Sequence, residues 1–227
     1  MADVESRRFA PAPADNGVPL DWRRSLPVLT SEDVVLREVQ LADAATLARL
    51  MTMPEVARFI SPPPPTVDGF ERFIATSQRQ RALGEGACFA VTLRDGGPPI
   101  GIFQIRMPLP LQPDIALIGS PLSTAEWGFA LSSECWGTGI FQQAAALILE
   151  FAFDLVGVRR LEARCALNNG RGQRALAKVG ATAEGILRQG LLAADGPLDQ
   201  VLWAIVDRDW RQRRGASHST TGALRVH

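Results

Sequence analysis

The residues best suited to chemistry in this 227-residue chain form the loop Trp136–Ile140, with the sequence WGTGI. Gly137 and Gly139 have no side chains, so the backbone N–H groups of the loop can come close to a bound oxyanion. A helix is predicted to begin at the end of the loop, and a helix N-terminus adds unpaired N–H donors and partial positive charge. The loop is therefore suited to binding phosphate.

A Gly-x-Gly sequence before a helix is a weak signal on its own, because a tight turn without any ligand explains it equally well. Two more specific phosphate motifs do not match. A dinucleotide fingerprint needs a third glycine where this chain has Gln142, which disfavours a dinucleotide-binding oxidoreductase. A nucleoside-triphosphate loop needs a Gly-Lys-Ser/Thr ending, which does not occur in the sequence.

Two strands and one helix are predicted to hold this loop in place. The first strand, Thr124–Leu131, is rich in Thr, Trp and Phe, and the second is Arg159–Leu167. Between them, apolar residues recur at three- and four-residue spacing from Ile140 to Leu155, which predicts a helix with one face against a sheet. Gly157 is expected to end this helix.

The order of these segments resembles the GNAT acyltransferases, in particular their RimJ/RimL-like branch. The resemblance rests on Glu126-Trp127-Gly128-Phe129, Trp136-Gly137-Thr138-Gly139, Phe151-Ala152-Phe153, Asn169 and Lys178-Val179-Gly180. It covers roughly Val34 to Trp210. It implies an α/β fold with a mixed, mostly antiparallel central sheet flanked by helices.

The resemblance also implies that acetyl-coenzyme A is the acyl donor. Its pantetheine arm would run along the strand Thr124–Leu131 and bond the main chain of Phe129, Ala130 and Leu131. Asn169 would reach the arm from the next strand, with a helix cap as the alternative role for this residue. The phosphates would be held by the loop and the first helical turn, that is, by Gly137, Thr138, Gly139, Ile140, Phe141 and Gln142.

Acyl transfer to an amine needs a base that removes a proton from the amine. The chain has no tyrosine, and both histidines, His218 and His227, lie near its C-terminus, so Asp and Glu are the main candidates. The resemblance favours Glu126, because this residue lies on the strand that would carry the donor. A salt-bridged or solvated strand residue is the alternative interpretation.

Two positions depart from the family pattern. Glu134 stands where relatives have Gln or Arg, and its charge would repel pyrophosphate unless the side chain points away. Gly172 falls where many relatives place a Ser or Tyr that protonates the leaving thiolate. Cys135 and Cys165 are expected to be packing residues, since neither has a histidine partner.

The remaining chain is read as a single domain, residues 27–210, between two tails. Residues 1–26 contain prolines that break regular structure, although Trp22 could dock on the domain. Residues 211–227 are polar and are expected to be disordered. Two further helices are predicted at Leu41–Met53 and Asp68–Leu83, joined by an extended proline run at 62–65. The proline run is either a rigid surface linker or, as the GNAT resemblance implies, a border of the acceptor pocket. Five more strands are predicted at 34–39, 87–94, 99–107, 181–192 and 198–206, the last two around the turn Asp195-Gly196. Residues 108–119 are expected to form a loop insertion.

Composition limits the possible partners. Lys plus Arg and Asp plus Glu both number 24, so the net charge is zero and no global basic field for nucleic acid is expected. No apolar run is long enough for a membrane span, and the histidine positions give no metal site. An odd number of cysteines, three, favours a reducing cytoplasm.

The sequence thus predicts a cytoplasmic, acetyl-coenzyme A-dependent N-acetyltransferase without a metal. The acceptor would be a primary amine, either a protein N-terminus or a small amine, and a homodimer is left open. A catalytically weak acyl-coenzyme A-binding or regulatory module is the alternative, favoured by the missing acid at Gly172.

Overall fold

The computed structural model describes residues 21–107 and 123–220, with side chains up to Gly215. Eight strands form one sheet in the order β1-β2-β3-β4-β5-β6-β8-β7. Their bounds are β1 Leu29–Thr30, β2 Val34–Glu38, β3 Gly86–Leu93, β4 Gly101–Arg106, β5 Thr124–Leu131, β6 Arg160–Ala166, β7 Thr182–Ala193 and β8 Gly196–Val206. Among these strands only β5 and β6 pair in parallel, so the expected mixed, mostly antiparallel sheet is confirmed.

Six α-helices accompany the described sheet, with bounds α1 Ala44–Met51, α2 Pro54–Ala57, α3 Val67–Leu83, α4 Ile140–Glu150, α5 Gly170–Lys178 and α6 Asp207–Thr220. Helix α3 begins where the Thr66 hydroxyl accepts a hydrogen bond from the Gly69 N–H at 3.1 Å, and it ends at Gly84 with φ 77°. Helix α4 continues as one π-helical segment, Phe151–Val156, up to Gly157 with φ 81°. The predicted helix end at Gly157 and the predicted last residue of α3, Leu83, are confirmed.

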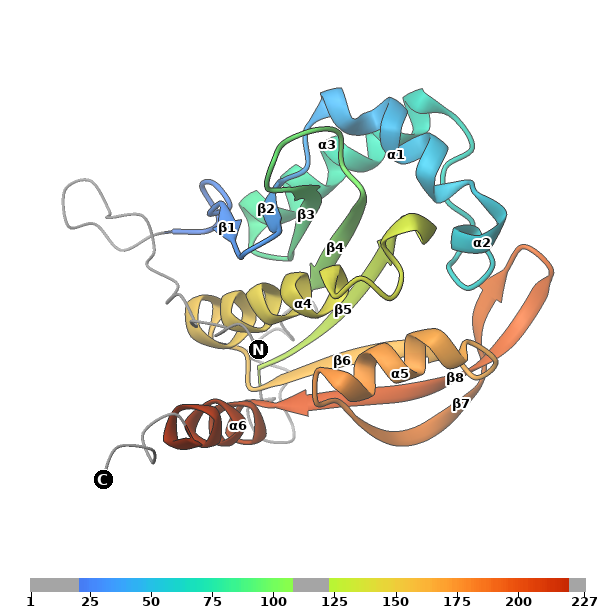
Figure 1. Cartoon of the computed structure of the whole chain (residues 1–227). Helices are drawn as coiled ribbons and strands as arrows, with labels where there is room; N and C mark the ends of the chain where they lie inside the picture. The colour runs from blue at the N-terminus through green and yellow to red at the C-terminus, as the bar shows by residue number, and fades with distance from the viewer. Residues whose placement is uncertain (1–20, 108–122, 221–227) are drawn as a thin grey trace, which may run out of the picture.

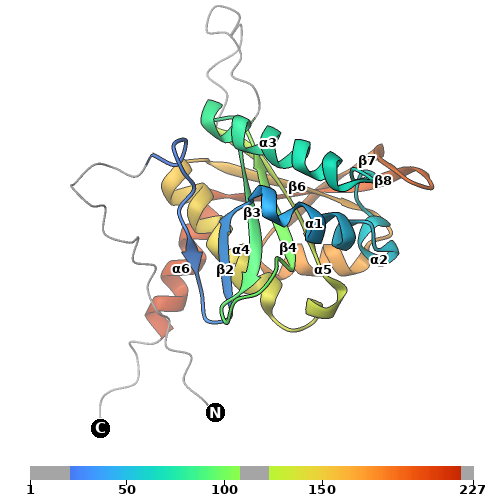
Figure 2. The ribbon, with the colours of Figure 1, turned by 90° about the horizontal axis from the view of Figure 1, so that it is seen from above.

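Each face of the sheet has its own hydrophobic core. The larger core packs α4 against strand residues such as Phe89, Phe103 and Trp127, which are at most 2% exposed. The second core packs α1 and α3 against the opposite face, with Phe70 and Ile74 almost fully buried. Figures 1 and 2 show α1 and α3 side by side, with α4 separate from them. The alternation of side chains along the strands thus builds two separate layers.

The parallel pair is short, and this feature positions the site. Strand β5 pairs with β6 over three residues, Thr124–Glu126 against Arg160–Glu162. Beyond Glu126 the two strands diverge, as Figure 1 shows. On their outer edges both strands remain paired, β5 with β4 up to Leu131 and β6 with β8 up to Ala166. The sheet therefore opens in its middle.

The segment just before residue 27 packs on the domain. Trp22 and Leu26 are each 8% exposed and belong to the larger core, so the described fold starts before residue 27. The Trp22 ring meets Phe151 edge to face, with ring centroids 6.1 Å apart. The possible docking of Trp22 is thus confirmed. Residues 1–20 and the predicted loop insertion 108–119 lie outside the described residues.

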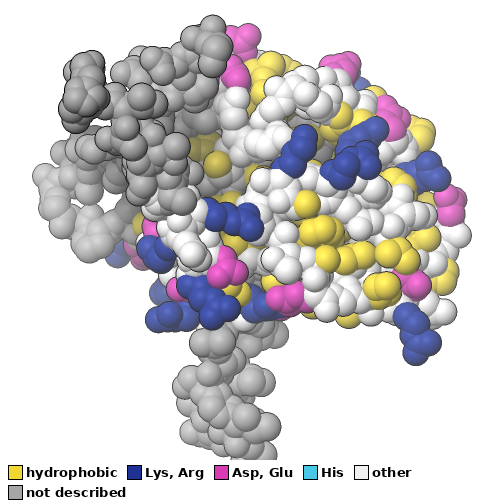
Figure 3. Space-filling view, turned by 60° about the horizontal axis from the view of Figure 1, so that its bottom comes forward, with side chains coloured by type: hydrophobic (Ala, Val, Ile, Leu, Met, Phe, Trp, Pro, Cys, Tyr) yellow, Lys and Arg dark blue, Asp and Glu magenta, His cyan; other side chains and the backbone are white. Residues whose placement is uncertain are grey.

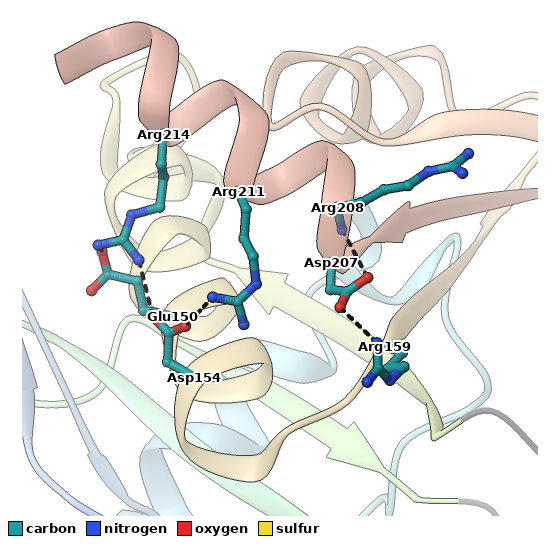
Figure 4. Close-up of polar contacts among 7 residues, drawn as sticks. All are labelled: Glu150, Asp154, Arg159, Asp207, Arg208, Arg211 and Arg214. Carbon is teal, nitrogen blue, oxygen red and sulfur yellow. Dashed lines mark hydrogen bonds and ion pairs between the residues drawn. The ribbon is translucent and has the colours of Figure 1, made fainter. Parts of the chain in front are cut away.

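The expected disorder from Arg211 is wrong up to residue 220, because these residues continue helix α6. Trp210 is 7% exposed and stacks on Phe153 with ring centroids 5.1 Å apart. Arg211 and Arg214 form ion pairs with Asp154 at 3.4 and 3.0 Å, as Figure 4 shows. The polar sequence does not reveal this anchoring, because one buried ring and several ion pairs with distant residues hold the helix.

Charges are mixed on the surface around these elements. Figure 3 shows Lys and Arg side chains lying beside Asp and Glu, with hydrophobic side chains between them. The long strand β7 is largely exposed and carries two exposed apolar side chains, Ile186 and Leu192. The face of the molecule drawn in Figure 3 has no large area of a single charge sign, which agrees with the zero net charge.

The contacts of α6 predict two different mutational effects. Trp210→Ala should lower the free energy of unfolding by about 3–5 kcal/mol, because it removes a buried aromatic ring. Arg211→Met should cost less than about 1 kcal/mol, since the ion pair with Asp154 is half exposed. Urea unfolding followed by circular dichroism measures both. A small loss in the Trp210 variant would show that α6 is not part of the cooperative fold.

Candidate active site

A cavity of about 850 Å³ lies where β5 and β6 separate. Its walls include Phe141 and Gln142 from α4 and also Phe70 and Phe73 from α3, so it reaches both faces of the sheet. Strands β4, β5 and β6 line its middle, and α5 forms a further wall. The volume lies within the range of small-molecule sites.

The open edge of β5 offers main-chain groups to this cavity. The Ser132 N–H donates to the Ile100 carbonyl at 2.8 Å, and in the antiparallel register Ala130 lies opposite Ile102. Because pairing alternates along a strand, the N–H and C=O of Ala130 point to β4, while those of Phe129 and Leu131 point to the open edge. We therefore correct the expected main-chain contact from Ala130, which lines the cavity but has its peptide groups engaged in the sheet.

Leu131 is partly engaged as well. Its carbonyl oxygen accepts a hydrogen bond from the Trp136 indole N–H at 3.2 Å. This bond folds the start of the glycine loop back onto the end of β5. Phe129 is therefore the β5 residue with main-chain groups most open to a ligand, and its side chain packs on Phe141 with ring centroids 4.5 Å apart.

The glycine loop has the geometry that an anion site needs. Gly137 and Gly139 have φ 83° and 93°, a region that only glycine adopts without strain. Nothing lies within 4 Å of a Cβ placed on either glycine, so the loop surface there is open. The Thr138 hydroxyl donates to the Cys135 carbonyl at 2.8 Å and holds the turn. Ile140 is the first residue of α4, and its side chain is buried. The N–H groups in the first turn of a helix have no partners within the helix, and here they include those of Phe141 and Gln142.

Helix α5 contributes positive charge that the sequence analysis missed. Arg171, Arg174 and Lys178 all line the cavity. Their spacing of three and four residues places them on one face of the helix, which is a pattern the sequence does contain. The Arg171 guanidinium lies over the Trp136 ring, 3.7 Å from the ring centroid, and so connects α5 with the glycine loop. Such a contact between distant segments cannot be read from spacing.

Asn169 caps helix α5, as the alternative interpretation proposed. Its side-chain oxygen accepts a hydrogen bond from the Gly172 N–H at 3.0 Å. The residue also lines the cavity. The capping role thus fixes the orientation of the Asn169 side chain at the edge of the cavity.

Glu126 lies at the point where the two strands part, as the last β5 residue paired with β6. Its side chain lines the cavity and is 44% exposed. Arg164 from β6 forms an ion pair with it at 3.7 Å, a longer separation than a hydrogen bond requires. Arg106 lies opposite Glu126 in the β4 register and also lines the cavity. The carboxylate is therefore both accessible and close to positive charge.

The positions that depart from the family pattern have structural explanations. Glu134 is exposed and is not among the cavity-lining residues, so its charge points away from the loop interior. A Cβ on Gly172 would lie 2.7 Å from the Cys165 sulfur and 2.8 Å from the Asn169 side-chain nitrogen. The missing side chain at Gly172 thus makes room for Cys165 and for the helix cap.

The cysteines are protonated packing residues at neutral pH. Burial raises the pKa of Cys165 to about 11 and that of Cys88 to about 12. The pKa of Cys135 is also raised, by burial and then by the charge of Glu134. A thiol nucleophile needs the opposite shift.

Two buried polar atoms near the cavity have no hydrogen-bond partner, the indole nitrogen of Trp127 and Oε1 of Gln200. Buried polar groups normally find partners, so each of these atoms leaves one hydrogen bond unmade among the described residues. Within residues 21–107 and 123–220, no cluster of His, Cys, Asp or Glu could hold a metal ion. No helix in the described part of the chain is long and apolar enough to cross a membrane.

Comparison with known sequences gives related proteins. The uncharacterized N-acetyltransferase YoaA of Bacillus subtilis is 24% identical over 183 residues, which is 79% of this chain and 97% of that protein. The uncharacterized N-acetyltransferase p20 of Bacillus licheniformis is 23% identical over 186 residues, which is 82% of this chain and 99% of that protein.

Solved structures share the fold. Mycobacterium smegmatis RimJ in complex with CoA-disulfide matches with a TM-score of 0.67 at 23% identity, covering 81% of this chain and 89% of RimJ. The ribosomal-protein-S5-alanine acetyltransferase from Vibrio fischeri matches with a TM-score of 0.68 at 19% identity, covering 81% and 98%. The family model of the acetyltransferase (GNAT) domain matches residues 33–182, well over half of the sequence. The chain therefore belongs to the GNAT acetyltransferases.

Proposed function

We propose that this acetyltransferase uses acetyl-coenzyme A to acetylate a primary amine by direct transfer, with Glu126 as the general base. The observation that carries the proposal is the cavity between β5 and β6. It joins an anion-binding loop on the α4 side to an accessible carboxylate at the point where the strands part. Donor and acceptor can thus meet inside the sheet.

The residues present suit coenzyme A, which supplies an activated acetyl thioester when bound. Gly137, Thr138, Gly139 and the first turn of α4 would hold its pyrophosphate through N–H groups. The basic face of α5 would add charge for its remaining phosphate. The solved RimJ structure also contains a coenzyme A adduct.

Glu126 would take the proton from the acceptor amine, directly or through one water, as the amine attacks the acetyl carbonyl. The new C–N bond then replaces the C–S bond, and the thiolate takes a proton from water. A free thiol has a pKa near 8.5, so a side-chain acid at position 172 is helpful rather than necessary. The three cysteines are unpaired, which supports the reducing cytoplasm as the place of action.

A catalytically weak acyl-coenzyme A-binding module remains the second candidate. It is favoured by Gly172, which leaves the site without an acid, and by the ion pair that Glu126 makes with Arg164. Single-turnover acetyl transfer separates the two candidates. Tight binding of acetyl-coenzyme A with no transfer to any amine would favour the binding module.

The loop geometry predicts the effect of Gly139→Ala. A side chain at φ 93° costs about 1–2 kcal/mol and turns the loop N–H groups away from the phosphates. Affinity for acetyl-coenzyme A should fall about 10-fold or more, since one hydrogen bond to a charged group contributes about 1.5–3 kcal/mol. Isothermal titration calorimetry measures this affinity.

Gly96→Ala is the matched control for the loop variant. Gly96 has φ 98° and nothing within 4 Å of an added Cβ, but it does not line the cavity. It should lose similar stability and keep full affinity for acetyl-coenzyme A. Equal affinities in the two variants would exclude the loop as the phosphate site.

Glu126→Gln should keep acetyl-coenzyme A binding and lower turnover by about 10²- to 10⁴-fold, the usual contribution of a general base. Glu162→Gln is the control, because Glu162 is the neighbour of Glu126 in the β6 register but does not line the cavity. Steady-state rates between about pH 6 and 9 test both variants. Wild-type turnover in the Glu126 variant would remove this residue from the mechanism.

The crowding at Gly172 predicts that Gly172→Ser is harmful. The new Cβ would meet Cys165 and the Asn169 cap, so the melting temperature should fall and acetyl transfer should not increase. Adding Cys165→Ala removes one of these contacts and should restore part of the lost stability. Urea unfolding of both single variants and the double variant should give a coupling energy of about 0.5–3 kcal/mol. Independent effects would mean that the contact with Cys165 does not matter.

A further inference from the structure

We propose that the acceptor is a primary amine that carries one bulky apolar group and no second positive charge. This substrate class rests on the proposed N-acetyltransferase function and on the part of the cavity that faces α1, α2 and α3. That part has an apolar wall, an open floor and few acidic groups.

The wall is formed by α2, the proline run and α3. Its apolar side chains are Met51, Val56, Phe59, Ile60, Phe70 and Phe73, and Pro62, Pro63 and Pro64 continue it. The only other wall residues in this described segment are Glu55 and Ser61, and Glu55 accepts a hydrogen bond from the Ser133 hydroxyl at 3.1 Å. An acceptor with an apolar side group pays little desolvation free energy on this wall. A polar side group would lose its hydrogen bonds to water without gaining hydrogen bonds to the protein.

The wall is held in place from two sides. Phe70 is 2% exposed in the core between α3 and the sheet, and Phe73 packs on its edge with ring centroids 6.1 Å apart. Phe59 packs against the small cluster that includes Leu191 and Ala166, which connects α2 to the β7–β8 hairpin. The apolar surface is therefore part of the fold and is available without rearrangement.

The floor opens at Gly128. This glycine lies between Glu126 and Ala130 on the same face of β5, and all three line the cavity. Nothing lies within 4 Å of a Cβ placed on Gly128, and its φ is not positive, so any L-residue can be placed there without strain. The space beside the proposed base is thus free for the carbon skeleton of the acceptor.

Charge in the cavity disfavours polycations. The lining contains five basic residues, Arg106, Arg164, Arg171, Arg174 and Lys178. Among the described lining residues the acidic ones are Glu55 and Glu126. Arg164 already pairs with Glu126, and Arg106 lies beside it in the register. A second ammonium group would find Glu55, which already accepts a hydrogen bond from Ser133, as its carboxylate on this side, and it would also face these guanidinium groups.

Acetyl transfer to a set of amines tests this class. The probes are phenethylamine, a peptide that begins with Phe, spermidine, and a peptide that begins with Asp. We expect kcat/KM to be about 10- to 100-fold higher for the first two, which is the discrimination that an apolar pocket gives. The ratio between phenethylamine and the Phe peptide tells whether a small amine or a protein N-terminus is preferred.

Gly128→Val fills the floor and is the sharpest variant. It should lower kcat/KM for phenethylamine by about 10-fold or more, leave transfer to methylamine within about 3-fold of wild type, and keep the affinity for acetyl-coenzyme A. Gly185→Val is the matched control, because Gly185 is a β7 glycine with open space around it and does not line the cavity. It should behave as wild type with every amine.

Each result decides the proposal. Higher kcat/KM for spermidine or the Asp peptide would overturn the apolar class, as would unchanged phenethylamine transfer in Gly128→Val. No transfer to any amine, with acetyl-coenzyme A still bound, would instead overturn the proposed N-acetyltransferase function. Phe73→Ala gives a second check, since it should raise KM for phenethylamine and leave KM for methylamine unchanged.

Discussion

The early end of pairing between β5 and β6 is the constraint on which this structure depends. Main-chain N–H and C=O groups inside a protein need partners, and a sheet normally supplies them from the neighbouring strand. After Glu126 that neighbour is missing, so the main chain of Phe129 faces a cavity instead of a strand. A ligand with amide groups along its length can supply the missing bonds. The opening thus costs the sheet some stability and provides a site.

The opening is kept by packing on both sides of it. On the α4 face, Phe129 lies between Phe103 and Phe141 with ring centroids 5.4 and 4.5 Å away, so β5 is held to β4 and α4. On the other side, β6 is paired with β8 along its full length. The Arg171 guanidinium lies over the Trp136 ring, and this contact joins the β5 side and the β6 side where the two strands are far apart. Each strand therefore has a stable position without the other.

Local elements were predictable because they depend on neighbours in the sequence. The strand Thr124–Leu131, the helix from Ile140 and the helix ends at Gly84 and Gly157 follow from periodicity and glycine positions. The missed features depend on distant segments. The Trp210 ring stacks on Phe153 and so holds helix α6, whose polar sequence resembles that of a disordered tail. The direction of the Ala130 peptide groups depends on the pairing register of β5 with β4. Neither can be seen without the fold.

The ion pair between Glu126 and Arg164 lies across the opening, one residue on each strand, just where main-chain pairing ends. In the proposed mechanism it bridges the point at which the amine approaches, and the two partners are about equally exposed, at 44% and 43%. A bound amine therefore competes with the guanidinium for the same carboxylate. At 3.7 Å the pair is loose and half exposed, so displacing it costs little, and contacts elsewhere in the cavity decide which amine is bound. The apolar wall of α2 and α3 is the surface that can provide these contacts, which connects the choice of acceptor to the position of the base.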